Sequence, residues 1–267
     1  MSTLSLDRYL ARESAIHAAD ARLKFIATAG FILALSLLPV GAFAALALAW
    51  AAVVIASAAA RVGWLRTTTG AFFALPFLLA AAPLVFTRQA DPLGEVDLRL
   101  FTLTVSGEGL KMFATIALKS WVSVQAALLL SFTTPFHELV DALRRLRLPS
   151  LMVAIISFMY RYIAVLAEES SRMMRARAAR SASRDGHTGG SVIWRAKVVG
   201  SMVGSLFLRA YERSERVYAA MQSRGFSGEI RHMGGRKLRS GEWLALGTVA
   251  AGLSGFSVAA RLWFPTA

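Results

Sequence analysis

A long uncharged stretch near the N-terminus is the feature that most constrains the fold. Residues 25–60 contain no charged side chain, and only the segment Leu38-Pro39-Val40-Gly41 interrupts their apolar character. A helix that crosses a bilayer needs about 20 mostly apolar residues, whereas adjoining Pro and Gly residues mark a turn. The stretch therefore predicts two membrane-spanning helices that are joined by a tight turn.

Three further apolar runs follow along the chain. Residues 67–87 are uncharged but contain Pro76 and Pro83, which would kink a helix. The other two runs cover residues 111–133 and 243–260. The composition agrees with a membrane protein, because 17% of the residues are charged against about 25% in soluble domains. We therefore predict an all-α integral membrane protein with at least five transmembrane helices.

Residues 148–167 form another apolar stretch, and this one contains a single charge, Arg161. A charge at the centre of a bilayer costs about 2.5–3.5 kcal/mol on insertion scales. We expect the guanidinium either to snorkel to the interface or to pair with Glu168, Glu169 or a partner subunit. The sequence leaves open whether this stretch spans the membrane or lies on its surface.

Lysine and arginine near the span ends predict the orientation, because they concentrate on the cytoplasmic side. Basic residues before residue 25, and Arg61 and Arg66 after the second span, place the N-terminus and this loop inside. The loop 88–109 has a net charge of −2 and is expected outside. Residues 134–240 hold 19 basic and 8 acidic residues, which gives +11 of the chain's net charge of +14.

We therefore expect three regions with different environments. The lipid bilayer surrounds the first and the last of them, and the cytoplasm surrounds the middle one. The regions are four membrane helices within residues 1–133, a cytoplasmic arginine-rich segment at 134–240, and a final span within 241–267.

Two long amphipathic helices are expected in the cytoplasmic segment. The first begins at Thr134-Pro135, with Thr134 as N-cap, breaks at residues 148–150 and continues to about Arg184. The second runs from Ser191 to about Ser223 and ends at a glycine, which is typical of helix C-termini.

Each of these helices has an arginine near its C-terminal end, Arg180 in the first and Arg224 in the second. Both arginines are compatible with a solvated basic face beside the negative end of the helix dipole. They are also compatible with docking into acidic clefts of a cytoplasmic partner, because guanidinium pairs bidentately with carboxylates. Their spacing alone does not decide between the two interpretations.

Several motifs point to a known family. The N-terminal segment Asp20-Ala21-Arg22-Leu23-Lys24 looks like one of them, with alanine in place of a proline. The other motifs are Thr133-Thr134-Pro135-Phe136-His137-Glu138-Leu139, Ala142-Leu143-Arg144-Arg145-Leu146-Arg147-Leu148-Pro149, Phe158-Met159-Tyr160-Arg161-Tyr162-Ile163, the stretch from Glu168-Glu169 to Ala179-Arg180-Ser181, and Glu215-Arg216-Val217-Tyr218-Ala219-Ala220-Met221-Gln222-Ser223-Arg224-Gly225-Phe226. In these motifs, and over most of its length, the chain resembles the CbiQ type of T-component, the transmembrane scaffold of energy-coupling-factor importers for cobalt or nickel.

The resemblance implies two long coupling helices that rest on a pair of ABC-type ATPases. In this family each coupling helix ends in an Ala-Arg-Gly-like motif whose arginine sits in an ATPase groove. The matching positions are Ala179-Arg180-Ser181 and Ser223-Arg224-Gly225, each with one departure from the consensus. Arg175, Arg177 and Arg184 compete with Arg180 for the register of the first motif. The resemblance also implies a separate substrate-binding membrane subunit, similar to CbiM.

The sequence contains no recognisable catalytic or metal-binding motif. The basic stretch Gly234-Gly235-Arg236-Lys237 has the wrong spacing for a phosphate-binding loop, and the chain has no cysteine. The segment His137-Glu138-x-x-Asp141 lacks the second histidine of a zinc protease motif. We therefore expect a non-catalytic subunit without cofactor or metal site, with ATP hydrolysis on the partner ATPases.

The resulting hypothesis is a coupling subunit in a bacterial inner membrane, with a cytoplasmic N-terminus. One alternative is a T-component that serves vitamin-binding subunits. A stand-alone secondary metal transporter would need ionisable residues within its spans, where Lys119 is almost alone. A nucleic-acid partner is not expected, because the aromatic residues follow the apolar faces rather than the basic ones. The sequence does not separate cobalt from nickel.

Overall fold

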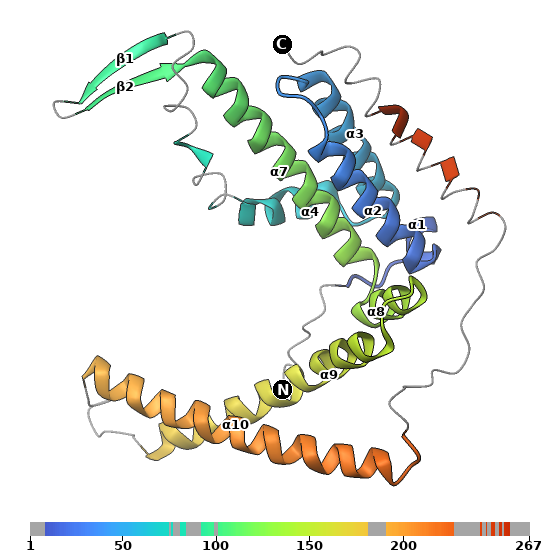
Figure 1. Cartoon of the computed structure of the whole chain (residues 1–267), viewed down its shortest axis with the longest axis vertical. Coiled ribbons are helices and arrows are strands. Elements are labelled where there is room, and N and C mark those ends of the chain that lie inside the picture. Colours follow the sequence, from blue (N-terminus) through green and yellow to red (C-terminus); the bar gives the residue numbers. More distant parts are fainter. Residues whose placement is uncertain are drawn as a thin grey trace. The chain divides into compact units, whose positions relative to one another are not determined.

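A computed structural model describes most of the chain. It covers residues 9–74, 76, 81–83, 92–98, 101–180 and 191–226, together with residues 241, 244, 247–248, 251–252 and 254–256. The chain divides into two units, with the boundary between Ala142 and Leu143. Most of the predicted final span and all of the loop 185–190 lie outside the described residues, so both remain predictions (Figure 1).

The two helices predicted within residues 25–60 are present. Helix α2 (Ala21–Ser36) and helix α3 (Phe43–Ala59) are joined by a short turn, in which Gly41 has a φ of 85°. Glycine suits this turn because a Cβ atom is unfavourable at positive φ. Asp20 caps α2 by accepting a hydrogen bond from the N–H of Arg22. A short helix, α1 (Ala15–Ala18), precedes them.

Helix α7 (Gly107–Thr133) packs against both α2 and α3 and forms the core of the first unit with them. The facing side chains are small or aliphatic, which lets the three backbones approach closely. The buried core residues are Leu35, Leu38, Ala42, Ala45, Leu46, Ala49, Val53, Val122 and Ala126.

Two lysines form hydrogen bonds between α2 and α7, one donating from α2 to the end of α7 and the other from α7 to the end of α2. Lys24, in the first turn of α2, is buried and donates to the carbonyl oxygen of Thr133 at the end of α7, at 3.1 Å. Lys119, midway along α7, donates to the carbonyl oxygen of Leu38 just beyond α2, at 2.6 Å. The last carbonyls of a helix lack intrahelical donors and form the negative end of its dipole. Each ammonium group therefore caps the neighbouring helix, and the pair fixes α2 and α7 antiparallel.

The third apolar run, residues 67–87, differs from the prediction in where its helix begins and in how regular that helix is. Helix α4 (Trp64–Gly70) starts earlier and changes to a 3-10 turn, η1 (Ala71–Ala74). The change precedes Pro76, which cannot donate a backbone hydrogen bond to the carbonyl of Phe72. The remainder of this run is largely outside the described residues.

The described part of the chain is predominantly helical, as predicted. One exception is a β-hairpin, which occupies part of the segment 88–109 that was expected to be a loop. Strand β1 (Pro92–Leu98) pairs antiparallel with β2 (Phe101–Ser106), with Glu95 opposite Thr104. Alternating Thr with Leu and Val favours a strand, and analysis by charge alone missed this pattern. Because α7 follows β2 directly, it begins at Gly107 rather than near Lys111.

The second unit contains two helices of 31 residues each, α9 (Ser150–Arg180) and α10 (Val192–Gln222). Both were predicted, and the predicted break before α9 is a turn in which Arg147 has a φ of 68°. Ser191 caps α10 by accepting a hydrogen bond from the N–H of Trp194. Among the described helices, α7 and α9 are long and apolar enough to cross a bilayer, and α3 is a shorter apolar helix.

Helix α8 (Phe136–Arg145) corrects the predicted capping of the first cytoplasmic helix. The N–H of Thr134 donates to Leu130, so this residue still belongs to the last turn of the preceding helix. Its buried hydroxyl has no hydrogen-bond partner, and the first helical bond of α8 runs from Leu139 to the carbonyl of Pro135. Thr134 is therefore not the N-cap, whereas Glu138 lies in the first turn as predicted.

Replacing Lys24 with methionine tests the capping by lysine. Methionine keeps an apolar stem but removes the ammonium group, which leaves the carbonyls of His17 and Thr133 without this donor. We expect a loss of about 1.5–3 kcal/mol of stability, seen as a thermal midpoint several degrees lower in detergent. Lys111→Met is the matched control, because Lys111 is exposed on α7. An equal decrease in the control would contradict the capping role.

Candidate functional site

The predicted docking arginines lie at exposed helix ends. Arg180 is the last described residue of α9, and both it and Ala179 are exposed. Arg224 lies in the turn that follows α10 and is exposed together with Ser223. The third residue of the first motif, Ser181, lies outside the described residues.

The end of α10 explains the glycine in the Ser-Arg-Gly motif. Gly225 has a φ of 79°, and its N–H donates to the carbonyl of Gln222 at 2.9 Å. The N–H of Phe226 donates to the carbonyl of Met221 at 3.0 Å. Together these bonds form a Schellman motif, which stops the helix and satisfies its last carbonyls. Arg224 is thus held at the negative end of the helix dipole with its side chain accessible.

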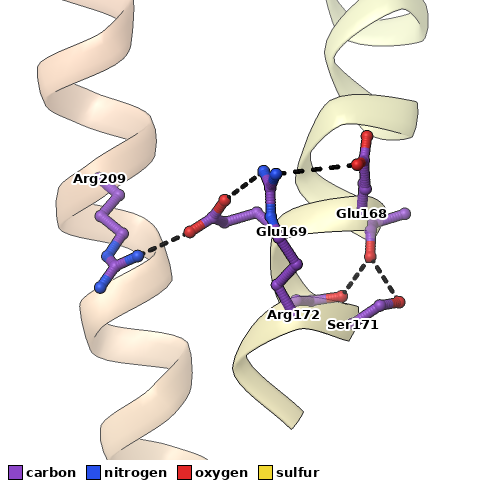
Figure 2. A network of polar contacts seen from close by, with 7 residues as sticks. Glu168, Glu169, Ser171, Arg172 and Arg209 are labelled. Carbon is purple, nitrogen blue, oxygen red and sulfur yellow. Dashed lines mark hydrogen bonds and ion pairs between the residues drawn. The ribbon is translucent and has the colours of Figure 1, made fainter. Parts of the chain in front are cut away.

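A carboxylate joins the two long helices of the second unit. Figure 2 shows Arg209 reaching from α10 to Glu169 on α9, where the guanidinium and the carboxylate are 2.6 Å apart. The other carboxylate oxygen of Glu169 accepts a hydrogen bond from Arg172 of its own helix, at 2.7 Å. One side chain therefore neutralises an arginine on each helix through charge-assisted hydrogen bonds.

A groove of about 710 Å³ lies between α9 and α10 beside this contact. Met173, Val198 and Met202 contribute its apolar part, and Trp194 lines it near the start of α10. Its charged residues are Glu169, Arg172, Arg177, Arg180 and Arg209, so that one acid faces four bases. Arg180 of the first predicted motif belongs to this groove, whereas Arg224 does not line it.

The structure separates Arg161 from the acids that were considered as its partners. Glu168 and Glu169 both pair with Arg172, and Glu169 pairs in addition with Arg209. Arg161 is exposed. The sequence analysis did not predict the contact between Glu169 and Arg209. Two adjacent acids in a strongly basic segment were nevertheless a sign that one of them pairs with a distant arginine.

The described part of the chain contains no cluster of metal ligands: no three residues of the types His, Cys, Asp and Glu lie close enough together there to hold a metal ion. His137 and Glu138 lie on α8 and do not belong to a group of three potential metal ligands among the described residues.

The pKa of Glu169 predicts how the contact between the helices responds to acid. Hydrogen bonds from Arg172 and then from Arg209 hold this pKa below its ordinary value. The ion pairs therefore stabilise the contact above the ordinary glutamate pKa of about 4.3, and this stabilisation is lost as the pH falls through the lowered pKa. The difference in thermal midpoint between wild type and Glu169→Gln should stay constant from about pH 8 to 5 and shrink only below about pH 4.

The chain is similar to known transport proteins over most of its length. Residues 12–234 match the CbiQ family, described as cobalt transport protein. The energy-coupling factor transporter transmembrane protein EcfT of Thermanaerovibrio acidaminovorans is 30% identical over 99% of this chain and 97% of its own length. EcfT of Heliobacterium modesticaldum is 28% identical over 85% of this chain and 86% of its own length. The nickel permease LarQ of Lactiplantibacillus plantarum is 29% identical over 43% of this chain and 39% of its own length. With the family match covering most of its residues, the chain belongs to the CbiQ family.

Proposed function

We propose that the chain is the transmembrane coupling subunit of an energy-coupling-factor importer for Co²⁺ or Ni²⁺. The observation that supports this most is a pair of 31-residue helices, α9 and α10, each with an exposed arginine at its end, in a member of the CbiQ family. The relatives named EcfT support the class of transporter, and LarQ and the family description support the metals.

In this proposal Arg180 and Arg224, with Ala179, Ser181, Ser223 and Gly225 around them, dock into grooves of two ABC-type ATPases. Arginine suits the task because its planar fork pairs with a carboxylate through two parallel hydrogen bonds, which lysine cannot do. The Schellman turn at Gly225 fixes the backbone from which Arg224 projects. A fixed backbone lowers the entropy lost when the side chain binds.

The chain then transmits motion and performs no chemistry itself. ATP binding closes the partner ATPases, whose grooves move the docked ends of α9 and α10. The movement passes to a CbiM-like substrate-binding subunit that is held against the membrane helices. Such transmission requires contacts that differ between two states, because a ligand shifts a conformational equilibrium only through its differential affinity. The transported ion binds to the partner subunit.

The proposed topology places the protein in a bacterial inner membrane with its N-terminus in the cytoplasm. Helices α2, α3 and α7 are spans in this topology, as are residues 67–87 and 243–260. The hairpin β1–β2 then lies outside and α10 lies inside, in agreement with the charges around them.

Charge reversal at both helix ends tests the docking. The double variant Arg180→Glu and Arg224→Glu should lose co-purification with the ATPases while it still inserts into the membrane, because carboxylates would repel an acidic groove. Arg175→Glu with Arg213→Glu is the matched control, since both residues are exposed on the same two helices. Normal co-purification of the first variant, or equal loss in the control, would refute the assigned positions.

Cysteine accessibility tests the topology, and the chain has no cysteine of its own. A single cysteine at Thr104 should react with a membrane-impermeant maleimide in intact cells. A single cysteine at Ser201, which is exposed on α10, should react only after the membrane is opened. Labelling of Ser201→Cys from outside would overturn the proposed orientation.

A further inference from the structure

The arginines that line the groove between α9 and α10 raise an electrostatic problem. Arg172, Arg177 and Arg180 come from α9 and Arg209 from α10, and like charges across a shared groove repel each other. Glu169 is the acid in this lining. Its position therefore matters for how closely the two helices can approach.

Glu169 is placed to act on both helices at once. Its two carboxylate oxygens are divided, one to Arg172 at 2.7 Å and the other to Arg209 at 2.6 Å. The acid is also the most covered of the three side chains, with 18% of its surface exposed against 52% and 60% for the two arginines. The carboxylate thus occupies the inner position, and the guanidinium groups reach toward it from either side (Figure 2).

The neighbouring acid provides a natural contrast. Glu168 is 63% exposed, and its carboxylate lies 3.7 Å from Arg172, four residues along the same helix. This is a surface pair within one helix, of a kind that contributes little to stability. Two consecutive glutamates therefore have different surroundings, and one of them connects α9 with α10.

We propose that Glu169 is a positioning residue, which sets the crossing of α9 and α10 and thereby the direction in which Arg180 and Arg224 are presented. The proposal deepens the proposed function and depends on it for the docking of these arginines. From the crossing, Arg180 is eleven residues away and Arg224 is fifteen residues beyond Arg209, or roughly 16 and 22 Å of helix. A rotation of about 10° at the crossing would move each tip by roughly 3–4 Å.

Distances between spin labels test the crossing in the full chain, without any partner. Met174 and Val203 are exposed on α9 and α10, so a cysteine at each position accepts a label in this cysteine-free protein. In Glu169→Gln we expect a distance distribution roughly twofold broader and shifted to longer distances, because Arg172 and Arg209 then lose the carboxylate that lies between them. Glu168→Gln is the matched control and should leave the distribution unchanged.

A charge exchange separates a specific pair from a general loss of structure. The double variant Glu169→Arg with Arg209→Glu restores one acid between the two helices and should bring the distribution back toward that of wild type. A distribution in Glu169→Gln identical to wild type would overturn the proposal. Failure of the exchanged pair to restore it, in a protein that is helical and monodisperse, would overturn it as well.

Co-purification with the ATPases distinguishes this proposal from the proposed function. If Glu169→Gln changes the spin-label distances and also weakens co-purification severalfold, both stand together. If wild type itself binds no ATPase while the distances still respond to Glu169→Gln, the docking function fails and the role of Glu169 in the crossing remains. If the distances respond but ATPase binding and transport are unaffected, presentation of the arginines does not depend on the crossing, and that part of the proposal is wrong.

Discussion

The mutual capping of α2 and α7 by lysine is the interaction on which the first unit depends. The last carbonyl groups of a helix lack intrahelical donors, and at the buried residues Leu38 and Thr133 water does not reach them readily. Lys24 and Lys119 supply these donors across the helix pair, one at each end of their contact. The small and aliphatic side chains of α2, α3 and α7 add dispersion contacts along the length of the helices. The two ammonium groups add directional hydrogen bonds at defined positions.

Charge has the opposite distribution in the second unit, where it lies between exposed helices rather than at buried helix ends. A single carboxylate, Glu169, holds a guanidinium from α9 and another from α10. The carboxylate is the most covered of the three side chains, with 18% of its surface exposed, so it occupies the inner position of the contact. Charge therefore caps helix ends in the first unit and joins two helices in the second.

The sequence predicted the elements whose signals are local. Uncharged length predicted α2 and α3, a Pro-Gly segment predicted the turn between them, and Gly225 predicted the end of α10. Features that depend on distant residues were missed, as the pairing of Glu169 with Arg209 shows, because 40 positions separate them. The hairpin was missed for another reason, since a charge count does not register the alternation along residues 101–105. Thr134 was misassigned because its N–H already belongs to α7.

The Schellman turn after α10 has a consequence for the length of that helix. Because the turn ends the helix at Gly225 wherever that residue falls, an insertion or deletion between Arg209 and Arg224 carries the whole cap with it. Each residue added advances the cap by about 1.5 Å and turns it by about 100° around the helix axis. The number of residues between Arg209 and Arg224 therefore sets both how far Arg224 lies from the ion pair and in which direction around the helix axis it points. An insertion that keeps the direction of Arg224 would therefore need a length close to a whole number of turns, at about 3.6 residues per turn.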